Sequence, residues 1–183
     1  TSSRSTKLIH GGVRYIRHGN ISLVREALKE RSLLLKNAPH VVHTQAFVIP
    51  CYGLWQRFFY GVGMKLYDLL AGKHRIGKSR RLSRSETAEH LPSIKARGLV
   101  GGVLYHDGQF DDTRLLIDIL RTAVSHGAAV LNYSRVKTID ADEIGRIRYV
   151  SFIDTLTGEK HRVAAKAVIN AAGIFSDAVR RIQ

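Results

Sequence analysis

The strongest constraint on the fold lies between Asp111 and Gly127, where the run DDTRLLIDILRTAVSHG carries the signals of one amphipathic helix. An acidic residue stands at its start, where a carboxylate can accept free N–H groups, and Gly127 suits a left-handed C-terminal cap. A strand is expected at residues 129–133, and the apolar run Lys166–Asn170 predicts a second, buried strand. Strands and helices that alternate in this way predict an α/β fold with parallel strands and crossover helices.

Further elements follow from local start and stop signals. A helix is expected at residues 22–37, because Ser22 can act as its N-cap and Pro39 follows its end. Ser83 and Glu86 match a capping box, which predicts a short helix that closes before Pro92. The remaining expectations are a strand at residues 45–50, an antiparallel hairpin of residues 146–153 and 161–165 around the turn 154–159, and helices at 54–70 and from Ser176 onward.

The expected helix at residues 54–70 has a continuous apolar side. Its members recur at helical spacing: Trp55, Phe58, Phe59, Val62, Leu66 and Leu69. Such a face is more often packed in a protein core than laid on a membrane, so the core is the first interpretation. The flanking cations Arg57, Lys65, Lys73 and Arg75 keep open the alternative that the helix lies at a lipid interface.

Composition limits the class of protein and its partners. The 183 residues hold 29 lysines and arginines against 15 aspartates and glutamates, a net charge of +14, which favours an anionic partner. The single cysteine, Cys51, excludes an intrachain disulfide and suits a reducing compartment. No apolar run reaches the roughly eighteen residues that a spanning helix needs. The expected location is the cytoplasm, with peripheral association to the inner face of the cell membrane.

A strongly basic run extends from Lys73 to Arg84 (KHRIGKSRRLSR). Charge runs of this kind usually form a solvated surface, and that is the first interpretation. The run holds no aromatic residue that could stack on a base, so nucleic-acid binding is not expected of the chain. A non-catalytic basic module that binds anionic lipid or nucleic acid stays open as an alternative function.

Hydroxyl side chains and glycines are concentrated in the first fifteen residues, TSSRSTKLIHGGVRY. The hydroxyls, backbone amides and cations of such a segment can form a cradle for an anion or a cofactor. Gly11 and Gly12 allow close backbone packing against a planar ligand, and Arg14 offers a planar fork of donors for phosphate or carboxylate. An ordinary polar surface loop is the competing interpretation.

The order of residues in this segment, Ser-x-Ser-x-Lys-Leu-Ile-His-Gly-Gly-x-Arg-Tyr, resembles the flavin-loop signature of the FAD-dependent glycerol-3-phosphate dehydrogenases and the related glycerophosphate oxidases. The likeness continues through the chain to about Arg181. It includes the runs Leu23–Arg31 (LVREALKER), Tyr105–Leu115 (YHDGQFDDTRL), Asp154–Gly158 (DTLTG) and Val168–Gly173 (VINAAG). An ordered set of motifs is more specific than any one of them.

The resemblance implies FAD as cofactor and a role for individual residues. The implied cofactor contacts are Ser2, Ser3, Ser5, Lys7, Leu8, Gly11, Gly12, Val136, Ala172 and Gly173. The backbone of Val136 would recognise the adenine, and the small residues Ala172 and Gly173 would let the backbone approach the dinucleotide. Arg14 would hold the phosphate of glycerol 3-phosphate or orient its reacting end. Tyr15 and His10 complete the implied catalytic set, and a buried, hydrogen-bonded packing residue is the competing interpretation of His10.

The implied fold is α/β, part of an FAD/NAD(P)-binding domain of the two-dinucleotide-binding-domain flavoprotein type, with an antiparallel hairpin insertion. Residues 39–104 are expected to contribute to a substrate-side layer. The Gly-x-Gly-x-x-Gly turn that binds the FAD pyrophosphate is absent from the sequence, as is the later part of the substrate cap. Residues 1–183 are therefore expected to be a middle fragment of the enzyme that is inactive alone.

The implied activity is oxidation of sn-glycerol 3-phosphate to dihydroxyacetone phosphate, with hydride transfer to the flavin and electrons passed to a quinone or to oxygen. Another FAD-dependent amine or hydroxy-acid oxidoreductase of the same fold is the alternative enzyme. No metal is expected, because His106, Asp107 and Asp111 show no recognised ligand spacing. Asp111 and Asp112 suit a helix start better than acid/base catalysis.

Overall fold

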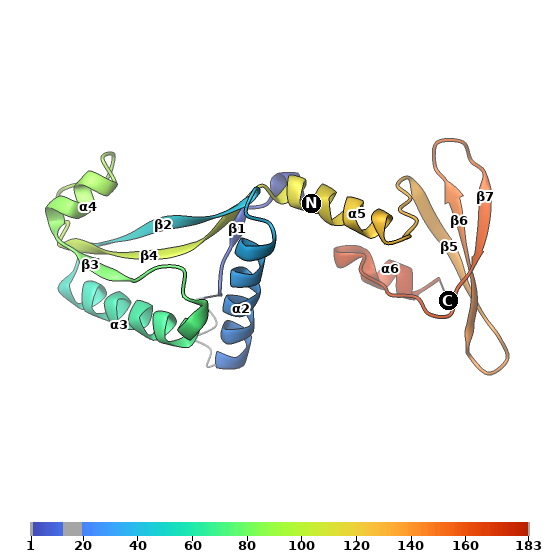
Figure 1. Cartoon of the computed structure of the whole chain (residues 1–183), viewed down its shortest axis with the longest axis horizontal. Coiled ribbons are helices and arrows are strands. Elements are labelled where there is room, and N and C mark those ends of the chain that lie inside the picture. Colours follow the sequence, from blue (N-terminus) through green and yellow to red (C-terminus); the bar gives the residue numbers. More distant parts are fainter. Residues whose placement is uncertain (1, 13–19, 183) are drawn as a thin grey trace. The chain divides into compact units, whose positions relative to one another are not determined.

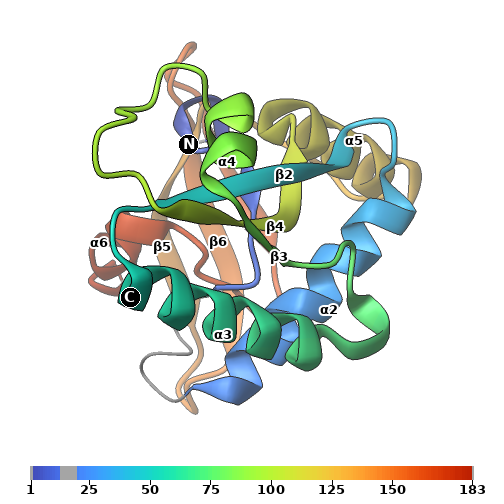
Figure 2. The same cartoon turned by 90° about the vertical axis from the view of Figure 1, so that its left-hand side faces the viewer.

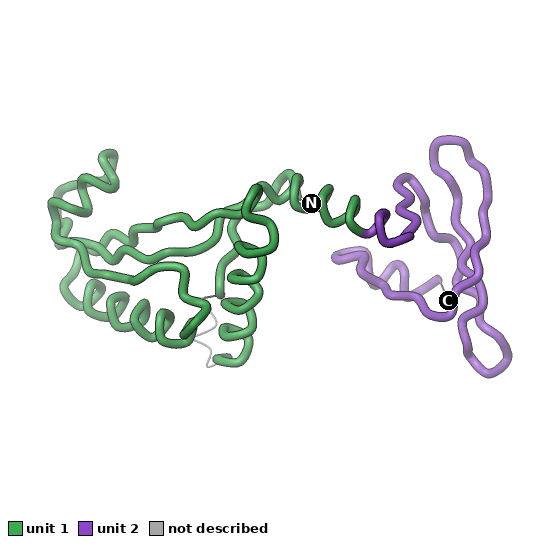
Figure 3. Tube along the Cα trace, in the orientation of Figure 1, with its two compact units in different colours: residues 1–122 green, residues 123–183 purple. Residues whose placement is uncertain are grey.

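The computed structural model describes residues 2–12 and 20–182, which fall into two compact units, residues 1–122 and 123–183 (Figure 3). Each unit contains its own sheet, and every strand pair among the described residues is antiparallel. The parallel strands expected from the sequence are therefore not formed by these residues. The run Lys166–Asn170 has no partner strand there and is irregular, with the side chain of Ile169 91% exposed.

The sheet of the first unit is built around one long strand. β4 (Gly101–Phe110) pairs along its full length with β2 (Val42–Cys51), which confirms and extends the strand expected at residues 45–50. The other edge of β4 pairs with β1 (Leu8–Ile9) near one end and with β3 (Arg80–Leu82) near the other (Figure 1).

Two long helices, α2 (Ile21–Asn37) and α3 (Leu54–Ala71), lie on the same side of this sheet (Figure 2). Both match their predicted ranges closely. Ser22 is not the N-cap of α2: the side chain of Asn20 accepts the backbone N–H of Leu23 at 3.3 Å instead. The cap therefore lies two residues earlier, because the asparagine oxygen reaches the third residue of the helix.

The shorter helices of the first unit confirm their predicted caps. In α4 (Arg84–His90), Ser83 Oγ accepts the N–H of Glu86, and Glu86 Oε2 accepts the N–H of Ser83 at 2.6 Å. α5 (Asp112–Ser125) begins where the carboxylate of Asp111 accepts the N–H of Arg114 at 3.1 Å. Single turns of 3₁₀-helix occur at Ser2–Arg4 and Gly72–His74.

The main core of the first unit lies between α2, α3 and the sheet. Its buried members are Val24, Leu28, Cys51, Met64, Tyr67, Ala71 and Val103. A second cluster of Ala38, Val41, Val42 and Leu115 packs the end of α2 and the start of β2 against the start of α5. Burial of these side chains supplies the main favourable free energy that holds the helices on the sheet.

The second unit is a three-stranded meander of β5 (Ser134–Ala141), β6 (Ile147–Asp154) and β7 (Lys160–Ala164). The β6–β7 pair confirms the predicted hairpin. Its turn is closed by Asp154, whose carboxylate accepts the N–H groups of Leu156 and Thr157. A 3₁₀ turn at Gly173–Phe175 leads into α6 (Ser176–Arg180), the helix expected from Ser176.

The prediction of a strand at residues 129–133 is wrong. The extended chain begins only at Ser134, because Tyr133 adopts a left-handed conformation with φ of 55°. The Tyr133 carbonyl accepts both the N–H and the hydroxyl of Thr155, which fixes this bend against the end of β6. A strand cannot pass through a residue with positive φ without breaking its extended geometry.

Candidate functional site

The N-terminal segment, residues 2–12, is fixed to the end of β4. Leu8 and Ile9 pair with Gln109 and Gly108, and the N–H of Phe110 donates to the carbonyl of Lys7 at 3.1 Å. The segment that carries most of the predicted cofactor contacts is therefore part of the sheet where it passes β4. A loop tied down by backbone hydrogen bonds is suited to hold a ligand in one geometry.

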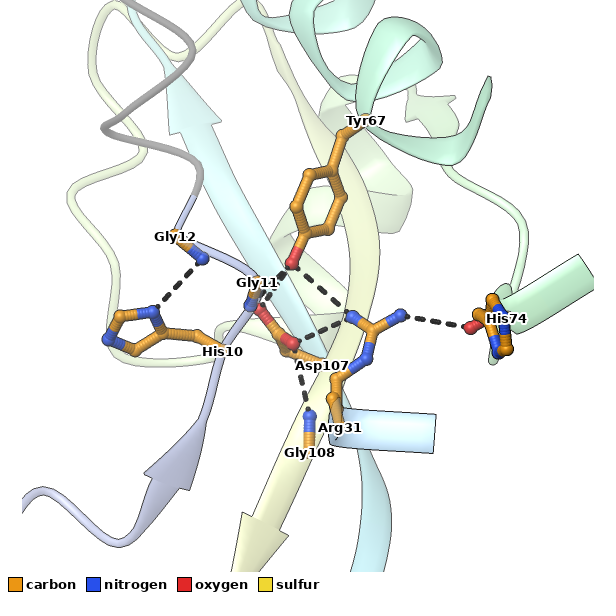
Figure 4. Close-up of polar contacts among 8 residues, drawn as sticks. All are labelled: His10, Gly11, Gly12, Arg31, Tyr67, His74, Asp107 and Gly108. Carbon is orange, nitrogen blue, oxygen red and sulfur yellow. Dashed lines mark hydrogen bonds and ion pairs between the residues drawn. The ribbon is translucent and has the colours of Figure 1, made fainter. Parts of the chain in front are cut away.

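Gly11 lies in close contact with two helices. Its N–H donates to the hydroxyl of Tyr67 on α3 at 2.8 Å (Figure 4). A Cβ at this position would overlap that hydroxyl and the side chain of Leu28 on α2. The close approach that glycine permits here is thus to side chains of the same chain. The next residue, Gly12, has φ of 69° and donates its N–H to Nδ1 of His10 at 3.2 Å.

A buried ion pair lies next to Gly11. Arg31 Nη1 on α2 donates to Asp107 Oδ1 on β4 at 2.8 Å, and the two side chains are only 2% and 4% exposed. The Tyr67 hydroxyl donates to Asp107 Oδ2 at 3.1 Å and accepts from Arg31 at 3.3 Å. Because it also accepts from Gly11, this hydroxyl uses its one proton and both lone pairs. We call Gly11, Arg31, Tyr67 and Asp107 the Tyr67 network.

The electrostatics of the network favour a neutral tyrosine. Burial raises the pKa of Tyr67 most, and the negative charge of Asp107 raises it further. The Tyr67 hydroxyl therefore remains a hydrogen-bond donor throughout the physiological pH range. Arg31 also donates to the carbonyl of His74 at 3.4 Å, while its buried Nε has no hydrogen-bond partner. The network joins α2, α3, β4 and the N-terminal segment at one point.

The predicted serine contacts have partners within the chain. Hydrogen bonds from Ser5 and then Ser2 lower the pKa of Asp112 at the start of α5. These two hydroxyls therefore lie against a carboxylate in this structure. Ser3 is exposed, and Lys7 has a positive φ of 56° that turns the chain into β1. Leu8 is half-buried beside β4.

The predicted cofactor contacts in the second unit are on open surface. Val136 lies in β5 opposite Phe152 and is 38% exposed. Gly173 has φ of 58°, and no other atom lies near the place where a Cβ would stand. The N–H of Ala172 donates to the side chain of Asn170 at 3.2 Å. Ala172 is half-buried and Gly173 is exposed.

The predicted catalytic residues are only partly described. Arg14 and Tyr15 lie outside the described residues. His10 is exposed, and its Nδ1 accepts the N–H of Gly12, so the imidazole orients the backbone beside Gly11. The capping role predicted for Asp111 is confirmed by its bond to the Arg114 N–H.

Asp107 belongs to the Tyr67 network, where its carboxylate pairs with Arg31 and accepts from Tyr67. Neighbouring residues on a strand point to opposite faces, so His106 cannot join Asp107 on one face of β4. No group of three histidine, cysteine, aspartate or glutamate side chains with metal-binding geometry occurs in residues 2–12 and 20–182.

The sequence interpretation did not find the roles of Arg31, Tyr67 and Asp107. One signal was present: Arg31 falls on the same side of the predicted helix as Leu28, in the middle of an apolar stripe. A charged residue in such a position is seldom buried without a partner, so it indicates a carboxylate elsewhere in the chain.

A family model for FAD dependent oxidoreductases matches residues 1–183, the whole chain. The chain belongs to the FAD dependent oxidoreductase family. This confirms the predicted flavoprotein family, and FAD is the cofactor that defines it.

Two curated relatives are similar over the entire chain. The mitochondrial glycerol-3-phosphate dehydrogenase of Rattus norvegicus is 44% identical over 194 residues, covering 100% of this chain and 27% of the relative. The mitochondrial glycerol-3-phosphate dehydrogenase SDP6 of Arabidopsis thaliana is 41% identical, covering 100% of this chain and 31% of the relative. The FAD dependent oxidoreductase described here thus spans less than a third of either relative.

Solved structures share its fold. The glycerol-3-phosphate dehydrogenase from Bacillus halodurans, complexed with FAD, has a TM-score of 0.70 and 32% identity, covering 99% of this chain and 28% of that protein. The L-alpha-glycerophosphate oxidase from Mycoplasma pneumoniae, with FAD bound, has a TM-score of 0.68 and 16% identity, covering 100% and 46%. At 16% identity, the likeness to the oxidase shows only that the fold is shared. Together they confirm the predicted α/β flavoprotein fold.

Proposed function

We propose that the chain is part of an FAD-dependent enzyme that oxidises sn-glycerol 3-phosphate to dihydroxyacetone phosphate. The observation that carries the proposal is the likeness of the whole chain to the FAD complex of the Bacillus halodurans dehydrogenase, with the same activity named in the curated relatives. Electrons pass to a quinone, with oxygen as the alternative acceptor. The protein is peripheral on a membrane, on its cytoplasmic side.

The described residues contribute to this activity by fixing the N-terminal segment, residues 2–12, which carries most of the predicted cofactor contacts. When bound, FAD accepts the hydride from C2 of the substrate. β1 fixes Leu8 at one end of the segment and the Tyr67 network fixes Gly11 at the other, so the segment would be held in one position for the flavin. In the second unit, Val136 would contact the adenine through its backbone, and Ala172 and Gly173 would allow the dinucleotide to lie close. Each of these contacts depends more on accurate placement of the backbone than on a reactive side chain.

Arg14 supplies the charge that the substrate needs. Its guanidinium binds the phosphate through paired hydrogen bonds, which positions C2 for transfer. Tyr15 and His10 are the candidates to orient the hydroxyl and to accept its proton, and the bond from the Gly12 N–H limits how far the His10 ring can rotate. The expectation that residues 39–104 belong to a substrate-side layer remains part of this proposal.

The test is substrate-dependent flavin bleaching in the full-length protein that carries this chain. Under anaerobic conditions, glycerol 3-phosphate should remove the flavin absorbance at about 450 nm, whereas amino acids and simple hydroxy acids should leave it unchanged. No bleaching by glycerol 3-phosphate, or equal bleaching by an amino acid, would overturn the proposal.

A series of variants tests whether Arg14 binds the phosphate of the substrate. Arg14→Gln should raise the substrate concentration for half-bleaching by about tenfold or more, because a charge-assisted contact is lost. Arg14→Lys should recover only part of the lost affinity for the substrate, since lysine cannot bind a phosphate bidentately. Arg4→Gln, at an exposed position in the same segment, is the matched control and should bind normally. If the Arg4 and Arg14 variants behave alike, the role assigned to Arg14 is wrong.

A further inference from the structure

The apolar side of α3 faces outward. The sequence favoured it as a core face, yet its side chains are exposed, with Trp55 at 74% and Leu69 at 75%. We call the outward stripe residues the α3 stripe: Leu54, Trp55, Phe58, Phe59, Val62, Leu66 and Leu69. Contiguous apolar surface of this length is uncommon on a soluble face and marks a surface that contacts something else.

The opposite side of α3 explains why the stripe is free. Gly61, Met64, Tyr67 and Ala71 are the buried residues of the helix, and they pack on α2 and the sheet. Gly61 approaches the side chain of Arg81 so closely that a Cβ would overlap it. The helix therefore already has a complete core face, and within the described residues of its unit, 2–12 and 20–122, nothing buries the stripe.

Cations flank the stripe on the side of β3. The guanidinium of Arg81 lies over the ring of Phe58, 5.6 Å from its centre. Beside them is an open groove of about 360 Å³, lined by Gly61, Lys65, Ser79, Arg80, Arg81 and Val103. Lys65 donates to the Ser79 carbonyl, which places its ammonium at this groove. The exposed Lys73 follows where the helix ends.

The stripe has no negative charge of its own. Asp68 is the only acidic residue in α3, and its carboxylate accepts the N–H and hydroxyl of Ser79, both at 2.8 Å. Glu86, near the groove, pairs with Arg80 at 2.6 Å. The outward surface of α3 is therefore aromatic, aliphatic and cationic, and it belongs to a chain with a net charge of +14.

We propose that the α3 stripe and its basic groove are the surface by which the protein lies on an anionic lipid bilayer, with a lipid phosphate in the groove. An amphipathic helix with aromatic residues on one side and flanking cations binds in the plane of the interface. Acyl chains cover the stripe, while Lys65 and Arg81 reach the phosphates. No described helix is long and apolar enough to cross a bilayer, which agrees with a helix that lies on the surface.

This lipid-binding role of the α3 stripe rests on the peripheral location in the proposed function, and it specifies which surface of the protein contacts the membrane. Charge complementarity selects the occupant. A covering protein segment would have to be acidic as well as apolar to match Lys65 and Arg81, whereas an anionic bilayer supplies both properties over the whole length of the helix.

The decisive variant is Trp55→Glu with Leu69→Glu in the full-length protein. Both side chains are highly exposed, so their replacement leaves the core intact. Binding to vesicles of phosphatidylcholine with about 30% phosphatidylglycerol should weaken by about tenfold or more. The matched control is Ile144→Glu with Leu156→Glu, at sites 71% and 72% exposed in the second unit, which should bind like wild type.

The groove is tested separately. Lys65→Gln and Arg81→Gln should each weaken binding by about fivefold, the equivalent of about 1 kcal/mol per cation near an anionic surface. Arg121→Gln and Arg135→Gln remove exposed cations elsewhere and should have little effect. Wild-type binding should fall steeply with salt and should be weak on pure phosphatidylcholine.

Trp55 also reports its own environment, because it is the only tryptophan of the chain. The emission difference between wild type and Trp55→Phe should shift to shorter wavelength on addition of anionic vesicles. Unchanged binding by the double glutamate variant would overturn the proposal. So would aggregation or loss of flavin in that variant but not in its control, because it would show that protein covers the stripe.

Flavin bleaching by glycerol 3-phosphate is measured without vesicles. Failure of the lipid proposal therefore leaves bleaching intact, and failure of the proposed activity leaves vesicle binding intact.

Discussion

The N–H of Gly11 donates to the hydroxyl of Tyr67 across 2.8 Å, although 56 residues separate them in the chain. The same hydroxyl donates to the buried carboxylate of Asp107. A single oxygen atom thus joins the segment with the predicted flavin contacts to the ion pair in the core.

Tyr67→Phe should loosen this segment. The substitution leaves the N–H of Gly11 and one oxygen of Asp107 without their partner, which costs about 1–3 kcal/mol of stability. Urea denaturation measures the loss, and amide exchange at residues 8–12 should accelerate. Tyr60→Phe, at an exposed ring of the same helix, is the control and should change neither quantity. Equal exchange rates in the two variants would contradict the role given to Tyr67.

Gly11→Ala and Gly63→Ala should have opposite effects. At Gly11 the new methyl overlaps Tyr67 and Leu28, so stability should fall by about 1–3 kcal/mol. At Gly63, within α3, no atom lies near the new methyl, and removing a helical glycine should stabilise by about 0.5–1 kcal/mol. Thermal unfolding of both variants checks the signs. A neutral Gly11→Ala would show that the segment can move away from α2 and α3.

Asp107→Asn should be among the more damaging single changes. It leaves the charge of Arg31 buried without its carboxylate, which costs about 3–5 kcal/mol. Asp140→Asn, which breaks the exposed pair with Arg162, should cost about 1 kcal/mol or less. Chemical denaturation of both variants makes the comparison. Similar losses would mean that burial does not govern the strength of these pairs.

The capping box should give the protein an acid-sensitive contact. Hydrogen bonds from the Ser83 backbone and then from Arg80 lower the pKa of Glu86 from 4.5 to about 2. Because the folded pKa is the lower one, the stabilisation by ionised Glu86 is complete above the unfolded value of 4.5 and is lost as pH falls toward 2.

Glu86→Gln should therefore flatten the decline in melting temperature between pH 4.5 and about 2, relative to wild type. Glu89→Gln, at an exposed site on the same helix, is the control and should follow the wild-type profile. Parallel profiles for wild type and Glu86→Gln would rule out the Glu86 contact as the source of the decline in melting temperature at acidic pH.

Elements with local signals were predictable from the sequence, and elements that depend on distant partners were not. The capping box at Ser83 and the start of α5 at Asp111 are set by residues a few positions apart. The prediction of a strand at residues 129–133 failed, because the left-handed turn at Tyr133 depends on Thr155, in the turn that follows β6.

The orientation of α3 shows the same limit. Both sides of this helix carry apolar residues, and the side with Met64, Tyr67 and Ala71 is the buried one. What decides between them is the acceptor Asp107 on β4 and the close packing at Gly61, neither of which a helical pattern contains. The burial of Arg31 is likewise determined 76 residues away, by the same aspartate.

The position of β4 has a consequence for the order of events during synthesis. Leu8 pairs with Gln109, so the N-terminal segment leaves the ribosome about a hundred residues before its partner strand exists. At roughly 5–20 residues per second, it waits several seconds or more without a sheet to join. Because β2 and β3 also pair with β4, the sheet of the first unit assembles only when this strand emerges. The segment with the predicted flavin contacts is thus translated well before its partner strand and is placed late.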